Sequence, residues 1–115
     1  VLYLPENEIH ELGLMYLNYE ILLKGYKTIY LGESVPIDSL TDMNKYYDTI
    51  VYVAYLTVQP TKDAINNYLE EITEKIINAN SQVYLLGRMT EFIDSTNISD
   101  KIVVYKSISD FVQEL

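Results

Sequence analysis

The sequence predicts a doubly wound α/β fold, in which a parallel sheet is covered by helices on both faces. Two observations lead to this prediction. Short apolar segments rich in Val, Ile, Leu and Tyr alternate along the chain with segments whose apolar residues recur at the helical period. Residues 49–56 are almost entirely apolar or aromatic, as expected of a strand that is buried on both faces. Strands that alternate with helical crossovers pair in parallel, so the alternation sets the fold class.

Each expected element has a local cause. The chain opens on the apolar, β-prone stretch VLYL, and an acidic loop then leads into a long apolar helical pattern. Glycines flank the second strand, a proline precedes the second helix, and the third helix repeats apolar residues along one stripe. The expected strands are residues 1–4, 27–31, 49–56, 82–86 and 102–105. The expected helices start near residue 10, cover 38–47, start at 61, cover 89–94 and cover 109–115.

Five such units predict the strand order 2-1-3-4-5 of flavodoxin-like (Rossmann-like) folds, with the first and third strands as central neighbours. Ligands of such sheets bind at the carboxyl ends of the strands, where the strand order reverses. The loops after Leu4, Leu56 and Leu86 are therefore expected at one edge of the sheet. We expect the functional site at that edge.

Length and composition limit the possible functions. The chain has 115 residues, 49% of them hydrophobic and 22% charged, which is typical of one soluble globular domain that spans residues 1–115. The net charge of −9 disfavours direct contact with nucleic acid, because such contact requires phosphates to be neutralised. We expect a cytoplasmic protein, since cysteine, a membrane-spanning stretch and a signal peptide are all missing from the sequence. The chain starts inside a strand without methionine, so we interpret it as a fragment of a longer protein.

The run Glu8-Ile9-His10-Glu11-Leu12-Gly13 contains the only histidine of the chain, at the junction of a strand and a helix. A neutral imidazole at such a junction can bind a transition metal, and a carboxylate two residues earlier can hold the ring. The alternative is that the histidine is only a polar neighbour of the helix start.

Other uses of this fold lack the residues that they need. The first loop, PENEIH, has no glycine for a dinucleotide, and Glu6 and Glu8 would repel a flavin phosphate. Ala54, Tyr55 and Leu56 stand where a phosphoacceptor domain has its aspartate. No serine in a nucleophile elbow accompanies the histidine. We therefore expect no catalytic residues and a protein that is not an enzyme.

The run from Glu8 to Gly13 resembles the Asp/Glu-x-His-x-x-Gly signature of cobalamin-binding domains. The fuller stretches LPENEIHELGL and GYKTIYLGESVP are similar to the C-terminal domains of MerR-type transcriptional regulators, and the resemblance covers nearly the whole chain. It implies a cobalamin cofactor whose cobalt has His10 as its lower axial ligand, with Glu8 orienting the imidazole. It also implies that Gly13 lets the helix pass close to the corrin or its nucleotide tail.

Two further motifs of these domains are only partly kept. The Ser-x-Leu or Ser-x-Thr after the third strand is matched by Ala54-Tyr55-Leu56, in which Ala54 has no hydroxyl for the nucleotide tail, a loss of about 1 kcal/mol for one hydrogen bond. The Gly-Gly after the fourth strand is matched by Gly87-Arg88. Arg88 either blocks the tail, points to solvent, or contacts a phosphate or propionamide group. The cofactor-binding residues implied by the resemblance are Glu8, His10, Gly13, Ala54, Leu56, Gly87 and Arg88.

The resemblance implies a ligand-sensing or oligomerisation domain of a MerR-type regulator. We then expect a homo-oligomer, with DNA-binding and helical-bundle domains upstream in the same chain. Two alternatives remain open: a cofactor-free descendant that serves as a dimerisation scaffold, and a corrinoid carrier domain of a methyltransferase or mutase. A DNA-reading helix pair upstream would favour regulation, and a catalytic barrel would favour the carrier.

Two further expectations concern apolar side chains. Met15, Leu17, Leu22 and Leu23 are expected in the core rather than in a cofactor pocket. Tyr55, at the mouth of the expected site, has a ring that could stack on a flat ligand.

Overall fold

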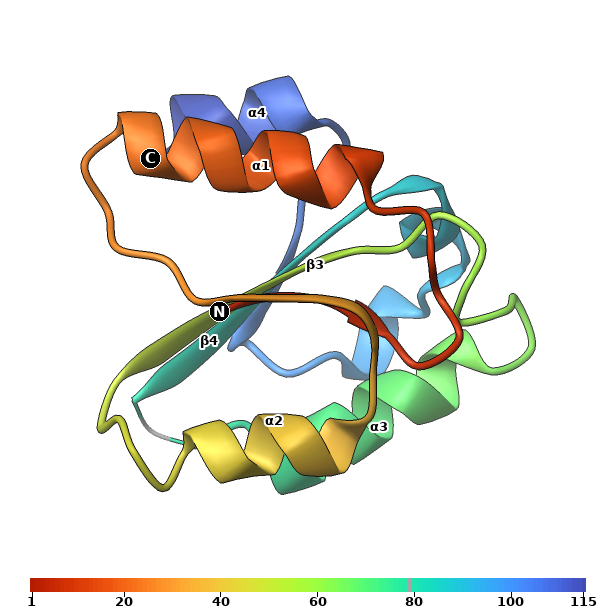
Figure 1. The fold of residues 1–115 in the computed structure, drawn as a ribbon. Coiled ribbons are helices and arrows are strands. Elements are labelled where there is room, and N and C mark those ends of the chain that lie inside the picture. Colours follow the sequence, from red (N-terminus) through yellow and green to blue (C-terminus); the bar gives the residue numbers. More distant parts are fainter. Residues whose placement is uncertain (79) are drawn as a thin grey trace.

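The computed structural model describes residues 1–78 and 80–115, and it has one sheet of five parallel strands between two layers of helices (Figure 1). The strand order is β2-β1-β3-β4-β5, with parallel pairing throughout. The predicted fold class, the strand order and the central position of the first strand are therefore confirmed. The strands are β1 (Leu2–Pro5), β2 (Tyr30–Val35), β3 (Ile50–Tyr55), β4 (Ser81–Leu86) and β5 (Ile102–Val104).

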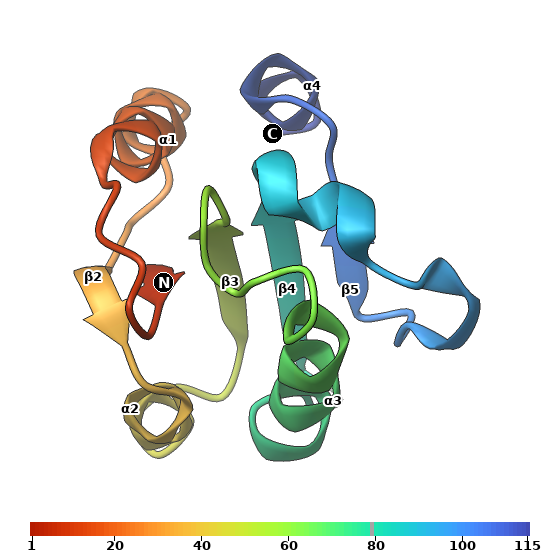
Figure 2. The same cartoon turned by 90° about the vertical axis from the view of Figure 1, so that its right-hand side faces the viewer.

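Helices cover both faces of the sheet (Figure 2). One face carries α1 (Leu12–Leu23) and α4 (Ile108–Gln113), and the opposite face carries α2 (Ile37–Met43) and α3 (Ile65–Lys75). Two 3-10 helices, η1 (Arg88–Phe92) and η2 (Ser95–Asn97), follow β4. Within residues 1–78 and 80–115, no helix has both the length and the apolar character needed to cross a membrane.

The sheet separates two apolar layers. In the layer toward α2 and α3, Tyr3 and Tyr52 are fully buried and meet edge to face, with ring centroids 6.4 Å apart. Their hydroxyls are satisfied: Tyr52 donates to Asn44 Oδ1 at 2.9 Å, and Tyr3 accepts from the Tyr68 hydroxyl at 3.0 Å. The buried layer toward α1 and α4 contains Leu2, Leu4, Leu14, Leu17, Ile21, Val53, Leu86 and Phe111.

The second strand lies later in the sequence than predicted. It was expected at residues 27–31 and covers Tyr30–Val35. Its second half has no apolar alternation, but the Ser34 amide donates to the Glu8 carbonyl at 3.0 Å and so continues the pairing toward the first loop. Gly32 and Ser34 adopt positive φ values of 85° and 50°, and the register with β1 shifts along the strand. Backbone hydrogen bonds, which leave no apolar pattern, extend this strand.

Four helices also differ from the prediction. The second was expected to cover 38–47 and ends at Met43. The first starts at Leu12 rather than near residue 10, because the Glu8 carboxylate binds the amides just before it and offers a local alternative to helix. The third starts at Ile65 rather than at residue 61. The short helix expected at 89–94 is the 3-10 helix η1.

The prediction that Met15, Leu17, Leu22 and Leu23 lie in the core is wrong for three of these four residues. Leu17 is fully buried, as expected. Met15, Leu22 and Leu23 are instead exposed, because they lie on the side of α1 that faces away from the sheet. The helix is apolar on both sides, so its sequence pattern could not indicate which side faces the core.

Candidate functional site

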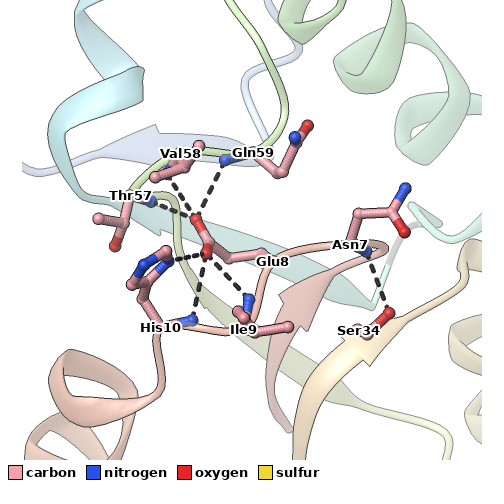
Figure 3. A network of polar contacts seen from close by, with 8 residues as sticks. All are labelled: Asn7, Glu8, Ile9, His10, Ser34, Thr57, Val58 and Gln59. Atoms are coloured by element: carbon pink, nitrogen blue, oxygen red, sulfur yellow. Dashed lines mark hydrogen bonds and ion pairs between the residues drawn. The ribbon is translucent and has the colours of Figure 1, made fainter.

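The loops after β1, β3 and β4 meet at one edge of the sheet, as predicted. The Leu56 amide donates to the Leu86 carbonyl at 2.7 Å, and the Met89 amide donates to the Leu56 carbonyl at 3.0 Å. These bonds join the loop after β3 to the loop after β4. The side chain of Glu8 joins the loop after β3 to the loop after β1 (Figure 3). The three loops therefore form one connected surface.

Glu8 lies at the centre of this edge and is only 1% exposed. Its Oε1 accepts hydrogen bonds from three successive backbone amides, those of Thr57, Val58 and Gln59, at 3.0, 2.5 and 3.0 Å (Figure 3). Successive amides that converge on one anion form a nest. The buried negative charge is thus compensated by backbone dipoles of the loop after β3.

The second carboxylate oxygen of Glu8 holds the histidine. Its Oε2 accepts from the backbone amides of Ile9 and His10 at 3.0 and 3.2 Å, and it lies 2.8 Å from Nδ1 of the His10 ring (Figure 3). Glu8 therefore fixes both the backbone and the ring orientation of His10.

The carboxyl group of Glu8 is ionised at neutral pH. Burial by itself would raise the pKa of Glu8, but the hydrogen bonds from Val58, His10 and Gln59 outweigh it and lower this pKa from 4.5 to about 2. An ionised carboxylate can only accept, so Nδ1 of His10 carries the proton and Nε2 of the neutral ring does not. The His10 side chain is 59% exposed. Its Nε2, on the side of the ring away from Glu8, is therefore a free and accessible ligand atom.

The loop that carries these residues is also held from the second strand. The Asn7 amide donates to Ser34 Oγ at 3.0 Å (Figure 3). The Ser34 amide donates back to the Glu8 carbonyl. Nearby, the Tyr30 hydroxyl donates to Glu11 Oε1 at 3.1 Å. Burial and then the Glu11 charge raise the pKa of Tyr30 to about 12, so this donor keeps its proton. The histidine thus lies on a loop that is fixed on two sides.

Gly13 does not leave an open space in this structure. A Cβ atom at Gly13 would lie 2.7 Å from Cε1 and 2.9 Å from Cδ1 of the Tyr55 ring. The ring of Tyr55 therefore packs directly on the first turn of α1. The half-buried ring of Tyr55, which could stack on a flat ligand, lies against Gly13 in this structure.

Gly87 packs against the backbone of the loop after β3. Its φ is +107°, and a Cβ there would lie 2.4 Å from the carbonyl oxygen and 2.6 Å from the amide nitrogen of Leu56. The missing side chain is thus needed for the packing of two loops.

Arg88 is exposed and has no hydrogen bond or ion pair within the described part of the chain, so it points to solvent. Ala54 is fully buried within β3.

The structure therefore brings together only some of the predicted site residues. The side chains of Glu8 and His10 are hydrogen-bonded to each other, and Gly87 contacts Leu56. The nest at residues 57–59 was missed, because backbone amides of any sequence can form it and no side chain signals it. Within residues 1–78 and 80–115, no three His, Cys, Asp or Glu side chains gather in a way that could hold a metal ion.

A separate cavity of about 650 Å³ lies on the face covered by α1 and α4, near the amino ends of the central strands. Its lining includes Leu2, Ile21, Val53 and Phe111, and it shares no residue with the Glu8–His10 edge. The inner face of α1 is buried in the core between Gly13 and Ile21. The cavity is therefore distinct from the candidate site, although α1 contributes to both.

Comparison with known proteins gives structural matches only. No protein-family model and no curated protein matches this chain. The monomethylamine corrinoid protein of Methanosarcina barkeri matches with a TM-score of 0.76 and 11% identity, over 98% of this chain and 54% of that one. A cobalamin-binding protein from Desulfitobacterium hafniense DCB-2 matches with a TM-score of 0.73 and 14% identity, over 98% of this chain and 55% of that one.

These matches show that the chain has the fold of both proteins. At 11% and 14% identity they show the fold alone. The chain spans about half the length of each protein.

Proposed function

We propose that this chain is a cobalamin-binding domain in which His10 is the lower axial ligand of cobalt. The Glu8–His10 pair carries this proposal, because a buried, ionised carboxylate holds Nδ1 at 2.8 Å and leaves Nε2 free on an exposed ring. Histidines that bind metals commonly donate their second ring nitrogen to a carboxylate in this way. When bound, cobalamin supplies a cobalt ion whose upper face can carry a reactive ligand. The protein's own part is to hold the lower face.

The residues present fit the cobalt side of cobalamin directly. No change is needed for Nε2 of His10 to meet a metal from solvent, because the ring is 59% exposed and already oriented. The nest at residues 57–59 keeps Glu8 ionised, and Glu8 in turn keeps the proton on Nδ1.

The nucleotide-tail side fits after one side chain moves. The Tyr55 ring occupies the space beside Gly13, and rotation of this half-buried ring at the end of β3 would open that space. On α1, the buried Oδ1 of Asn18 is the polar side-chain atom that lacks a hydrogen-bond partner within the described residues. It is free to accept a hydrogen bond from an amide or hydroxyl group of a ligand.

We further propose that the domain is the non-enzymatic sensor or oligomerisation domain of a MerR-type regulator. The similarity of LPENEIHELGL and GYKTIYLGESVP to such domains supports this assignment. The net charge of −9 also supports it, because DNA recognition would then belong to another domain of the same chain. A cytoplasmic location goes with that role.

A corrinoid carrier domain of a methyltransferase or mutase is the second candidate. One structural match is a corrinoid protein, and the Glu8–His10 geometry suits a carrier equally well. Any sequence that precedes Val1 in the full-length protein would separate the two candidates. A winged helix-turn-helix supports the regulator, and a catalytic barrel supports the carrier.

Titration of the purified protein with hydroxocobalamin tests cofactor binding. We expect a change in the visible spectrum as imidazole replaces the lower ligand, and we expect His10→Ala to abolish that change. Glu6→Gln is a matched control, because Glu6 is exposed and lies on the same loop, two residues before Glu8. A parent protein that gives no spectral change and no binding heat supports a cofactor-free scaffold instead.

A further inference from the structure

Helix α1 carries a second apolar stripe on the side that faces solvent. Its inner stripe, Leu14, Leu17 and Ile21, is buried in the core. The outer stripe is exposed, and its first residue, Leu12, is 83% exposed. The members of the outer stripe are Leu12, Met15, Tyr16, Tyr19, Leu22, Leu23 and, just beyond the helix, Tyr26.

The outer stripe is nearly free of charge in a strongly charged molecule. The chain contains 25 charged residues, 17 acidic and 8 basic, but Glu20 is the only one between Leu12 and Leu23. A surface helix normally presents charged and polar residues to water on its outer side. An apolar surface of this size on an otherwise acidic protein indicates contact with another macromolecule.

The stripe is symmetric about Tyr19. Met15 and Leu23 are each four residues from Tyr19, and Tyr16 and Leu22 are each three residues from it. Leu12 and Tyr26 are each seven residues away. If two copies of α1 cross antiparallel at Tyr19, every apolar side chain therefore faces an apolar side chain of the other copy. Such self-complementarity is what a twofold interface requires.

We propose that the outer stripe of α1 binds the outer stripe of a second copy of this chain in an antiparallel pair, with the twofold axis at Tyr19. Large side chains that are about half exposed or more give a surface on the order of 700 Å². A standard interface buries about 800 Å² on each partner. The stripe is thus large enough for a dimer.

Charge favours a second copy of this chain over a basic protein as the partner of the outer stripe. A basic protein would be attracted to the acidic surface elsewhere, whereas the stripe offers it only Glu20. A second copy places two uncharged stripes together and keeps the acidic surfaces apart. The remaining repulsion between two molecules of charge −9 is screened by salt, so the dimer should become tighter as salt concentration rises. This inference does not depend on cobalamin binding.

Sedimentation equilibrium of the parent and of two variants tests the pairing. We expect the parent to be a dimer at micromolar concentration and Tyr19→Glu to be a monomer with an unchanged circular-dichroism spectrum. Tyr46→Glu is the matched control, because Tyr46 is 77% exposed and follows α2, the helix that covers the opposite face of the sheet from α1. It should dimerise like the parent. A monomeric parent, or a Tyr19→Glu variant that dimerises as tightly as the parent, overturns the proposal.

Cysteine cross-linking tests the geometry, since the chain has no natural cysteine. A mixture of Met15→Cys and Leu23→Cys proteins should form a disulfide-linked heterodimer on mild oxidation. Neither variant alone should cross-link, because position 15 and its symmetry copy are then separated by about 12 Å along the helix axis, beyond the ~7 Å reach of a disulfide. Cross-linking of Met15→Cys with itself would show a parallel pair and contradict the proposal.

Discussion

Replacing Glu8 by glutamine tests how the site is held together. The carboxylate of Glu8 accepts hydrogen bonds from five backbone amides and from the His10 ring nitrogen, and it donates none. A glutamine side chain has the same shape but keeps only one acceptor oxygen. Its NH₂ group would face donors, so several buried amides would lose their partner.

The expected loss of stability follows from the pKa of Glu8. A change from 4.5 in the unfolded chain to about 2 in the folded protein corresponds to about 3 kcal/mol, at about 1.4 kcal/mol per pH unit. Because the folded pKa is the lower one, this stabilisation is fully present above pH 4.5 and is lost as the pH falls toward 2. Glu8→Gln should therefore lower the free energy of unfolding by about 3 kcal/mol at pH 7 and by roughly half of that at pH 3.

Urea unfolding at pH 7 and pH 3, followed by circular dichroism, measures this difference. Glu6→Gln is the control, because Glu6 is exposed and lies two residues earlier on the same loop. It should change the free energy of unfolding by less than about 0.5 kcal/mol. A loss below about 1 kcal/mol for Glu8→Gln at pH 7, or an equal loss at both pH values, would refute the role of the amide nest.

Three further substitutions are expected to give distinct results. Gly87→Ala should lower the free energy of unfolding in urea by at least about 2 kcal/mol, because Gly87 has a positive φ and lies against the Leu56 backbone. Gly25→Ala is the control, since Gly25 has a φ of +92° but open space around it, and it should lower this free energy clearly less. Equal losses for the two variants would contradict the loop contact. Tyr55→Ala should bind cobalamin about fivefold more tightly in isothermal titration, a gain of about 1 kcal/mol, because the space beside Gly13 is then open. Its affinity for cobinamide, which lacks the nucleotide tail, should stay the same. Weaker binding of cobalamin would show that the ring helps to hold the cofactor. Arg88→Gly should leave cobalamin affinity within about twofold, since Arg88 points to solvent, and a large change in either direction would place its side chain at the tail.

The sheet could be predicted from the sequence because burial leaves a pattern in it. The third strand is apolar on both faces, and the segments before and after it repeat apolar residues at the helical period. It lies between β1 and β4, as this alternation of strands and helices predicts. The second strand could not be placed correctly, because its half from Gly32 onward is extended by backbone bonds to the first loop. The first helix could not be oriented, because it has two apolar sides.

The candidate site shows the same division. The Glu8–His10 contact could be predicted, since two side chains with complementary chemistry lie two residues apart at a strand end. The contacts of Gly13 and Gly87 could not, because a glycine in a sequence says only that a side chain is missing. In the structure the two spaces are filled by the Tyr55 ring and by the Leu56 backbone. A glycine can make room for a ligand or for another part of the same chain, and the sequence does not distinguish these two cases.

The measurement that tests cobalt ligation by His10 most directly is the electron paramagnetic resonance spectrum of cob(II)alamin bound to uniformly ¹⁵N-labelled protein. The cofactor is unlabelled, so its own nucleotide base would couple to cobalt through ¹⁴N. If Nε2 of His10 is the lower ligand, each cobalt line splits into the doublet of ¹⁵N, and the His10→Ala variant loses the doublet. A triplet from ¹⁴N in the labelled parent, identical to that of free cob(II)alamin, would contradict ligation by His10.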